Sequence, residues 1–518
     1  MGQRFARNGL TLAAVGAAAM IAAGCTSSPA GTGTTSTVAG AARPTGSWPD
    51  PNGNLANTRD AAGATISSAN VSQLREAWDY RLPAAAAKNL SDTGSLAAAP
   101  VVVDGLVYLQ DLYANVYAIS LATGKLKWEY PVNIPMKTGP GPDGVAVAGG
   151  VVYGATPTAV FALNAATGAV IWDDTSLLGS GDGTFEIQPA VAGGRVYLAS
   201  AYGPNGGELL ALDASNGKKL WSFGTVKGAE PGVAALPLGS GGAWETPLVG
   251  ADGSVTFGTG NPYQSIGEAV THPARDLYTD SEVSLSAATG ALRWYYQAVP
   301  NDFKDWDMQL SPVAATVNGV PAVIGGGKMG DVYAFNAATG ALLWRTPVGV
   351  HDGTGNDSLL LLEHKLTIKL PYTYEPGPLG GVLTDMASAD GSVYVATVDL
   401  PFTFTSLNSV NGSASPSAKP SGEIEALNLN TGKVEWDTKV ASLPLGAVTV
   451  SDDLIFTTLV SGELVALNRS TGAIVREQRL PAATNSPIAV TSNAVLVPAG
   501  GPGAAADDNA QLVAYSVP

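Results

Sequence analysis

A short hairpin sequence ending in tryptophan recurs along this 518-residue chain and constrains the fold more than any other feature. A strand with apolar residues at every second position precedes each copy. Each copy then continues with Thr or Asn, followed by Gly and by a second strand. Glycine supplies the positive φ that a tight turn between antiparallel strands needs. The repeat therefore predicts a series of small antiparallel sheets. The copies are ATGKLKW ending at Trp128, ATGAVIW at Trp172, SNGKKLW at Trp221, ATGALRW at Trp294, ATGALLW at Trp344, NTGKVEW at Trp436 and a decayed STGAIVR at Arg476.

The spacing of the repeats predicts the architecture. Three of the tryptophan intervals are 44, 49 and 50 residues, close to the period of one propeller blade. The longer intervals of 73 and 92 residues each hold one turn motif, so each is interpreted as one blade with an insertion. Trp78 has no turn motif before it, and the strand at 512–517 has no tryptophan strand after it. We therefore expect an all-β, eight-bladed β-propeller of four-stranded antiparallel blades, its ring closed by N- and C-terminal strands that share one blade.

The repeated tryptophans are interpreted as structural. A strand on the outside of one blade needs a large flat apolar side chain where it packs against the next blade. An indole N–H at that position can donate to a backbone acceptor. No chemistry is assigned to these residues.

The N-terminal region predicts export and a lipid anchor. Residues 1–24 carry two arginines and then an apolar run too short to span a bilayer, and the sequence Ala-Ala-Gly-Cys follows. This resembles a bacterial lipoprotein signal peptide, with Cys25 as the lipid-modified residue. Residues 25–46 are rich in Gly, Ser, Thr and Ala and are expected to be a flexible tether. Residues 47–518 then form the propeller.

Cysteine content and charge exclude several kinds of protein. Cys25 is the only cysteine, so the fold has no disulfide, no thiolate metal site and no CxxCH haem attachment. The net charge is −16, and it becomes −18 without residues 1–24, which contain two arginines and no acid. Such a chain is repelled by nucleic acid and by anionic lipid. We expect membrane attachment through the lipid anchor alone, on the outer face of a bacterial cytoplasmic membrane or in the periplasmic or outer-membrane leaflet.

Four stretches carry a resemblance to a known family. They are SWPDPNGNLANTRDA, the turn-tryptophan repeats, GGAWETPLVGADGSVTFGTGNP and WYYQAVPNDFKDWDMQLSP. Together they resemble the pyrroloquinoline quinone (PQQ) dehydrogenases from residue 47 onward. The resemblance implies an exported eight-bladed propeller that oxidises alcohols or sugars with PQQ and calcium.

The resemblance also implies roles for individual residues. Trp244 corresponds to the tryptophan on which the quinone stacks, and Asn261 to an amide ligand of the calcium ion. Asp307 corresponds to the general base and calcium-site carboxylate, with Asp305 as a second catalytic candidate. Lys328 corresponds to the basic residue that hydrogen-bonds the quinone oxygens. A carboxylate near a Lewis-acidic metal can take the alcohol proton as hydride leaves for the quinone.

The chain also departs from the family pattern. A calcium-ligand glutamate is missing, because Glu208 falls too late in its stretch, and the vicinal cysteine pair of many alcohol dehydrogenases is absent. Two extra residues between Gln297 and Trp306 shift the spacing before Asp305 and Asp307. The alternative interpretation of this acidic stretch is a polar loop paired with Lys304. Residues 263–280, which follow Asn261, are a candidate lid.

Two functions remain open at this point. The first is a lipid-anchored PQQ- and calcium-dependent dehydrogenase of an alcohol or sugar, with a separate electron acceptor. The second is a non-catalytic propeller that binds a protein or glycan at the cell envelope, comparable to the outer-membrane assembly lipoproteins with the same repeats. Fold alone does not decide between them.

Overall fold

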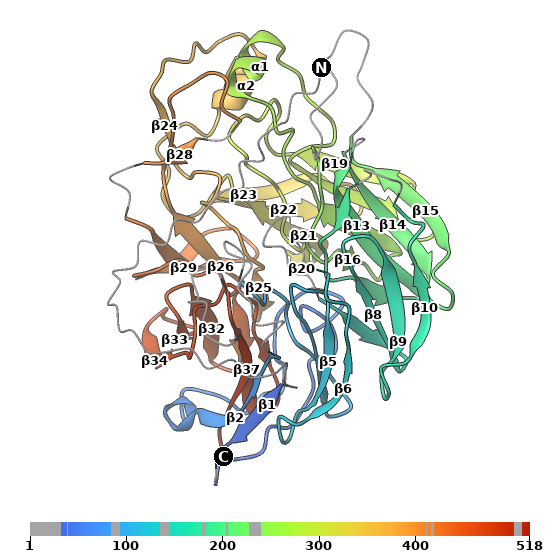
Figure 1. The fold of residues 1–518 in the computed structure, drawn as a ribbon. Coiled ribbons are helices and arrows are strands. Elements are labelled where there is room, and N and C mark those ends of the chain that lie inside the picture. The colour runs from blue at the N-terminus through green and yellow to red at the C-terminus, as the bar shows by residue number, and fades with distance from the viewer. Residues whose placement is uncertain are drawn as a thin grey trace, which may run out of the picture.

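The computed structural model describes residues 33–38, 40–83, 94–134, 144–178, 183–203, 206–226, 240–410, 412–415, 419–501 and 510–518. The described chain is an all-β, propeller-like arrangement of antiparallel sheets (Figure 1). The predicted signal peptide (1–24) and Cys25 lie outside the described residues. No helix in the described ranges has the length and apolar character needed to cross a membrane.

Seven four-stranded antiparallel sheets follow one another along the chain, and the third carries an additional short strand, β11 (Thr184–Phe185), on β13. The first three consist of β3 (Val101–Val103), β4 (Leu106–Gln110), β5 (Val116–Ser120) and β6 (Leu126–Tyr130); β7 (Ala146–Ala148), β8 (Val151–Ala155), β9 (Val160–Asn164) and β10 (Val170–Asp174); and β12 (Ala190–Ala192), β13 (Arg195–Gly203), β14 (Gly206–Asp213) and β15 (Lys219–Gly224).

The next four sheets have the same order. They consist of β16 (Leu248–Val249), β17 (Ser254–Gly258), β18 (Ser281–Ser286) and β19 (Leu292–Gln297); β20 (Val313–Val317), β21 (Val320–Gly327), β22 (Asp331–Asn336) and β23 (Leu342–Pro347); β25 (Ala387–Ala389), β26 (Ser392–Asp399), β29 (Ser421–Asn428) and β30 (Val434–Val440); and β31 (Thr449–Ser451), β32 (Leu454–Leu459), β33 (Glu463–Asn468) and β34 (Ile474–Arg479). First strands of neighbouring sheets contact one another, whereas most last strands alternate exposed and half-buried residues.

The two ends of the chain share one further sheet. Its order is β1 (Thr34–Thr37), β2 (Arg75–Arg81), β37 (Gln511–Ser516), β36 (Ala494–Ala499) and β35 (Ala489–Val490), and a short 3₁₀ turn (Val71–Gln73) precedes β2. Trp78 of β2 pairs with Ala514 of β37. The predicted pairing of the terminal strands is therefore confirmed. β1 falls inside the segment predicted as a tether, and there its Thr-rich run covers the outer edge of β2. For residues 25–32 the tether stays a prediction.

The repeated tryptophans join neighbouring sheets, as the sequence predicts. Each indole N–H donates to a backbone carbonyl of the following sheet, and its ring packs on the turn glycine there. The last interface has Arg476 instead of tryptophan, and its guanidinium donates to Ser72 O (3.2 Å) and Leu74 O (2.7 Å) before β2. The tryptophan donor pairs are Trp78 to Leu121 (2.8 Å), Trp128 to Ala165 (2.9 Å), Trp172 to Ala214 (3.0 Å), Trp221 to Ala287 (3.1 Å), Trp294 to Ala337 (2.8 Å), Trp344 to Leu429 (2.8 Å) and Trp436 to Arg469 (2.9 Å).

The glycine under each ring gives a first prediction. A methyl group added at Gly168 (φ +72°) would lie 2.7 Å from Trp128 Cε3, whereas one added at Gly150 (φ +78°) meets no atom within 4 Å. Both substitutions carry the strain of a positive φ. We expect Gly168→Ala to lower the free energy of unfolding by about 1–3 kcal/mol more than the matched control Gly150→Ala, because only the first overpacks a sheet interface. Denaturant titration measures this difference, and equal losses would contradict the docking role of Trp128.

An N-terminal segment rich in turns, residues 48–61, joins the first strands of four sheets. Its backbone pairs with Val102 of β3 and Val450 of β31, and it accepts hydrogen bonds from Ala314 of β20 and Ser388 of β25. Arg59 anchors this segment and is fully buried. The segment therefore ties together sheets that are far apart in sequence.

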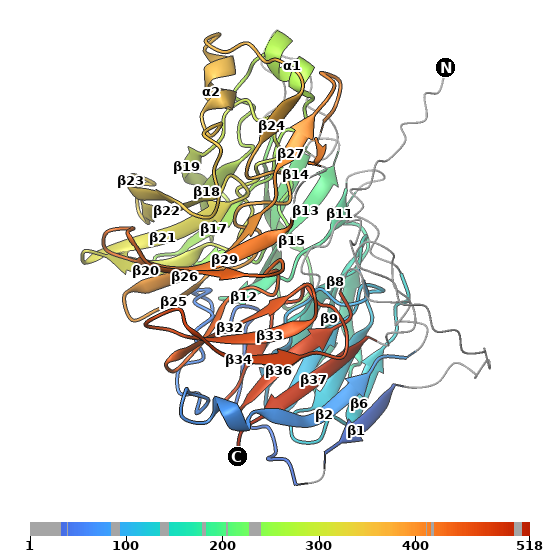
Figure 2. The same ribbon diagram turned by 90° about the vertical axis from the view of Figure 1, so that its left-hand side faces the viewer.

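The longer repeat intervals form a cap at one end of the molecule, here defined as α1, α2 and the sheet β24–β27–β28. It contains α1 (Ile266–Thr271), α2 (Asp357–Leu362), β24 (Tyr372–Tyr374), β27 (Phe402–Phe404) and β28 (Ser413–Ala414). α1 and α2 lie side by side at the end opposite the C-terminus (Figures 1 and 2). The segment 263–280 thus belongs to the cap, where Ser265 and Glu268 form a capping box at α1.

Candidate functional site

The acidic segment 302–309 lies between two strands that approach it very closely. Gly258 ends β17 and Gly327 ends β21, and a side chain at either position would overlap the carbonyl oxygens of Met308 or Asp307. Met308 N–H donates to Thr259 O (3.1 Å), and Lys328 N–H donates to Asp307 O (3.0 Å). The glycines therefore allow the backbone contact that fixes the acidic residues beside Lys328.

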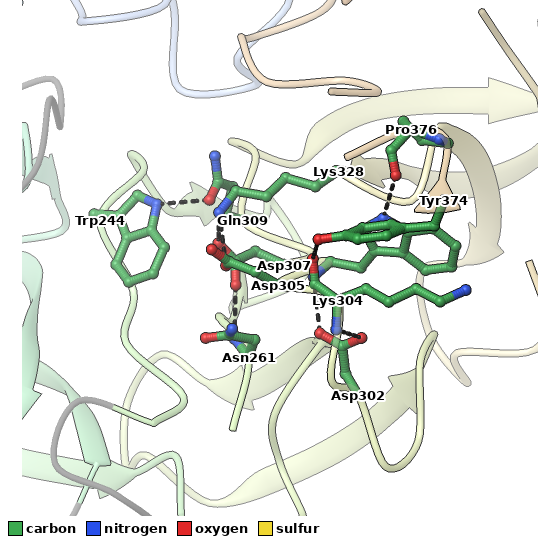
Figure 3. A network of polar contacts seen from close by, with 11 residues as sticks. Trp244, Asn261, Asp302, Lys304, Asp305, Asp307, Gln309, Lys328, Tyr374 and Pro376 are labelled. Atoms are coloured by element: carbon green, nitrogen blue, oxygen red, sulfur yellow. Dashed lines mark hydrogen bonds and ion pairs between the residues drawn. The ribbon is translucent and has the colours of Figure 1, made fainter. Parts of the chain in front are cut away.

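Alternation along this segment separates polar from apolar side chains. Trp306, Met308 and Leu310 are buried in the hydrophobic core, and each is at most 1% exposed. Asp307 and Gln309 point the other way, toward Lys328 and Trp244 (Figure 3). The core contacts thus hold the polar groups in one orientation.

Lys328 bridges two carboxylates at the centre of the site. Its Nζ lies 2.9 Å from Asp305 Oδ1 and forms a second, shorter ion pair with Asp307 Oδ2. Burial opposes the charge of Lys328, yet the two carboxylates raise its pKa above the ordinary value, so it stays a cation. Burial raises the pKa of Asp305, an effect that Lys328 opposes and Asp307 increases. One lysine thus balances two acids in a buried cluster.

Trp244 and Asn261 lie directly beside this cluster. The Trp244 Nε1–H donates to Gln309 Oε1 (3.0 Å), and the Asn261 backbone N–H donates to Asp307 Oδ1 (2.7 Å). A Cβ atom at Gly260 would lie 2.7 Å from the Trp244 ring and 3.3 Å from Asp307 Oδ1, so ring and carboxylate flank the same glycine. The Asn261 side-chain oxygen is buried and has no hydrogen-bond partner.

Residues 302–306 of the acidic segment form hydrogen bonds that hold the cap against the site. Asp302 accepts the backbone N–H groups of Lys304 (2.9 Å) and Trp306 (2.8 Å). Lys304 Nζ donates to Thr354 O (2.5 Å) and lies 3.9 Å from the centre of the Trp306 ring. Trp306 Nε1–H donates to Pro376 O (2.9 Å). Burial lowers the pKa of Lys304 to about 7, although acidic neighbours oppose this change. The cap therefore rests on the same loop that carries Asp305 and Asp307.

One further acid near the cluster, Asp280, was missed by the sequence analysis. Asp280 is fully buried, and neither of its carboxyl oxygens has a hydrogen-bond partner. Burial raises its pKa well above the ordinary value, and the charges of Asp302, Asp307 and Asp305 add to the rise. The Thr279 hydroxyl acts in the opposite direction and lowers the pKa of Asp280. Asp280 follows the α1 insertion, so no motif around it indicated the site.

Glu282 gives a pH-dependent prediction. It is 1% exposed, its Oε1 has no partner, and burial raises its pKa well above the ordinary value. Between its unfolded pKa, about 4.3, and its folded pKa, the folded protein holds the extra proton, so the stability contributed by this group falls as pH rises. Each pH unit in that window changes the free energy of unfolding by about 1.4 kcal/mol.

We therefore expect Glu282→Gln, which cannot ionise, to gain stability relative to the wild type between pH 4.5 and pH 8. Urea titrations at the two pH values measure the change, with the exposed Glu477→Gln as matched control. If the free energies of unfolding of the variant and the wild type differ by the same amount at both pH values, Glu282 does not take up a proton on folding.

The described residues supply only part of a calcium site. Calcium takes six to eight oxygen ligands. Asn261 offers a free amide oxygen, but Lys328 already engages both Asp305 and Asp307. Within the described ranges, no group of three or more His, Cys, Asp or Glu side chains is arranged to hold a metal ion. A planar quinone fits better, because Trp244 offers a flat aromatic ring and Lys328 offers N–H donors.

Comparison with known proteins identifies the family. Residues 48–148 and 190–349, just over half of the chain, match the family described as glucose/ethanol/alcohol dehydrogenase, beta-propeller domain. Residues 134–239 and 420–517 match a second family, outer membrane protein assembly factor BamB. The fold and the site together define a quinoprotein-type β-propeller. The chain belongs to the glucose/ethanol/alcohol dehydrogenase β-propeller family.

Individual relatives agree with this assignment. Quinohemoprotein alcohol dehydrogenase from Comamonas testosteroni is 27% identical over 508 residues, covering 84% of this chain and 69% of the relative. Quinohemoprotein alcohol dehydrogenase ADH-IIG from Pseudomonas putida is 31% identical over 311 residues, covering 54% of this chain and 42% of the relative. The solved structure of quinohemoprotein alcohol dehydrogenase ADHIIG from Pseudomonas putida HK5 matches with a TM-score of 0.76 at 21% identity, covering 91% of this chain and 80% of that chain, and supports the fold.

The structure brings the predicted site residues together. Asn261, Asp305, Asp307 and Lys328 are linked directly to one another, and Trp244, bonded to Gln309, lies beside them across Gly260 (Figure 3). The alternative interpretation of the acidic stretch, a polar loop paired with Lys304, fits Asp302 only, because the Asp302 side chain accepts the Lys304 backbone N–H. The Lys304 side chain instead donates to Thr354 O, just before α2 of the cap. Glu208 lies in β14 as expected. Gln309 was missed, although its position two residues after Asp307 in an extended segment was a usable signal.

Proposed function

We propose that this chain is an exported, lipid-anchored dehydrogenase that oxidises an alcohol or a sugar with PQQ, in an eight-bladed ring closed by its terminal strands. One observation carries the proposal: Asn261, Asp307 and Lys328 form a buried cluster with the half-buried Trp244 beside it, and these residues, spread over 85 residues of sequence, lie in the segment that matches the dehydrogenase family. The named relatives are quinohemoprotein alcohol dehydrogenases, which supports the reaction class.

The chain's own residues have distinct roles in this proposal. PQQ, when bound, supplies the electron sink for the hydride lost by the alcohol carbon. Trp244 would offer its aromatic face to the planar ring, and Gln309 fixes the indole through its side-chain oxygen. The Asp305–Asp307 pair accepts the hydroxyl proton. Lys328 holds this pair through its two ion pairs and would donate to the bound oxygens. Asn261 and Asp307 would contribute oxygen ligands to a calcium ion.

In this proposal the electrons leave through a separate electron acceptor. We propose that Cys25 carries the lipid that holds the protein at the outer face of the membrane. Cys25→Ala should then move the protein from the membrane fraction to the soluble fraction of the cells that express it.

A titration of the purified chain with PQQ, with and without calcium, tests the proposal. Saturable quenching of tryptophan fluorescence should disappear in Trp244→Ala and persist in Trp436→Phe, which alters a tryptophan between sheets. Dye reduction with a panel of alcohols and sugars should follow, and it should be lost in Asp305→Asn or Asp307→Asn. Equal PQQ binding with and without calcium would show that the PQQ site does not require the metal ion.

The second candidate is a non-catalytic scaffold at the cell envelope. The match of residues 134–239 and 420–517 to the BamB family favours it, as does a site in which Lys328 already balances Asp305 and Asp307. The absence of PQQ binding at high micromolar concentration would favour this candidate and direct the search to protein or glycan partners.

A further inference from the structure

One buried lysine lies where the cap meets the acidic segment. Lys304 is 0% exposed, and its side chain extends away from Asp305 and Asp307 (Figure 3). Its Nζ donates to Thr354 O, just before α2, at 2.5 Å. Four aromatic rings surround the ammonium group, two from the segment and two from β24. The distances from Nζ to the ring centres are 3.9 Å for Trp306, 5.5 Å for Phe303, 5.8 Å for Tyr372 and 5.9 Å for Tyr374.

The same contact is held by bonds and rings from both sides. The Trp306 indole donates to Pro376 O (2.9 Å), and the Tyr374 hydroxyl donates to Lys304 O (3.2 Å). The rings of Trp306 and Tyr374 lie 6.2 Å apart at 65°, and those of Phe303 and Tyr372 lie 5.7 Å apart. Because each side supplies half of the cage, movement of the cap away from the segment would expose Lys304 to water.

The ammonium group of Lys304 is poorly compensated in the closed cap. It has three N–H donors. Among the described residues, no carboxylate lies within ion-pair distance of its Nζ. Burial removes the hydration of a cation, and contacts with aromatic faces return only part of that free energy. The geometry therefore favours a neutral amine, and burial accordingly lowers the pKa of Lys304 to about 7.

The charges that face Lys304 come from two elements. Asp357 and Asp352 lie on the cap side and Asp302 on the segment side, and all three favour the charged lysine without cancelling the effect of burial. Tyr372 and Tyr374 of β24 stay neutral near pH 7 to 9, because burial raises the pKa of each phenol. β27 consists of Phe-Thr-Phe and adds no charge. Protonation of Lys304 is therefore coupled to the contact between cap and segment.

We propose that Lys304 is a pH-dependent latch, which holds the cap on the acidic segment while it is neutral and loosens the cap when it takes up a proton. In an opened cap the lysine returns to water, where its pKa is about 10.4, against about 7 in the closed cap. Closing then releases a proton between these values, so each pH unit upward favours the closed cap about tenfold, and below about pH 7 the dependence ends. The inference depends neither on PQQ binding nor on the lipid anchor.

Hydrogen–deuterium exchange of the full chain at pH 7.5 and pH 9.0 tests the latch. The rates are corrected for the known effect of pH on the exchange of free amides. We expect the amides of α2 and β24 to gain about tenfold or more in protection at pH 9.0. Amides of β32 in the ring should show no such gain, because Lys304 holds the cap alone.

Variants assign the effect to Lys304. Lys304→Met keeps an apolar stem in the cage and cannot be protonated, so the protection of α2 and β24 should be equal at the two pH values within about twofold. Lys433→Met removes an exposed lysine and should keep the wild-type dependence. If Lys304→Met unfolds at a lower denaturant midpoint, Lys304→Arg replaces it, since arginine stays charged at both pH values and should also abolish the dependence.

Three results would overturn the latch. The first is equal protection of α2 and β24 at the two pH values in the wild type. The second is the same gain in β32, which would indicate a change in the whole fold. The third is a tenfold gain that persists in Lys304→Met or Lys304→Arg, which would assign the proton to another group.

Discussion

Replacing Arg59 with methionine is expected to lower the free energy of unfolding by about 3–5 kcal/mol, because it removes one partner from a buried charged network. Arg59 is fully buried. Its guanidinium donates to Val448 O (2.8 Å), Ile488 O (2.7 Å) and the side chains of Asn52 and Thr449 (2.8 Å each). These acceptors belong to the segment before Arg59, to the start of β31 and to the approach to β35, so one side chain joins three parts of the fold.

Charge makes the same substitution more costly. Burial lowers the pKa of Arg59 to about 10, while Asp385 and Glu245 act in the opposite direction and favour its charge. Without Arg59, the buried Asp385 and the half-buried Glu245 both lose a balancing cation. Burial already raises their pKa values, so they would take up protons at higher pH in the variant.

Denaturant titration at pH 7 checks this prediction. Arg75→Met is the matched control, since Arg75 is exposed, and its effect should stay within about 0.5 kcal/mol. Arg59→Lys should fall between the two, because it keeps the charge and loses the fork of donors. A loss for Arg59→Met no larger than that of the control would show that the 48–61 segment is held by its backbone pairs alone.

The fold could be predicted because its signals are local and repeated. A glycine turn and a tryptophan recur in each copy, and Trp78 with the strand at 512–517 indicated that the chain ends pair. Even the decayed copy at Arg476 predicts a sheet boundary, although the structure was needed to show that arginine replaces the indole donor with a guanidinium.

The candidate site could be predicted only in part. Trp244, Asn261, Asp307 and Lys328 lie in recognisable stretches, whereas Asp280 and Arg59 do not. The pKa of Asp280 is raised by burial and by the charges of a loop that lies 22 or more residues away in sequence. Arg59 donates to acceptors that lie about 390 residues away in sequence. Such long-range contacts leave no periodic pattern in the sequence. The direction of the Lys304 side chain, toward the cap rather than toward the acids, depends on packing in the same way.

The second large effect is expected at Lys328. Lys328→Met should lower the free energy of unfolding at pH 8 by about 3–5 kcal/mol, because Asp305 and Asp307 would remain buried without their cation. The loss should shrink at pH 5. With the lysine gone, its charge no longer opposes the burial that raises the pKa of Asp305, so the folded state binds an extra proton there and its stability falls as pH rises.

The triple variant Lys328→Met/Asp305→Asn/Asp307→Asn separates charge from packing. It removes the cation and both acids together, so it should recover most of the stability at pH 8 and lose the difference between pH 5 and pH 8. The exposed Lys433→Met controls for the loss of a lysine. If Lys328→Met is as stable as the wild type at pH 8, the two acids are protonated in the native protein, and a neutral Asp305–Asp307 pair could not take the proton of an alcohol. The same titration therefore tests the electrostatic basis of the proposed dehydrogenase site without PQQ.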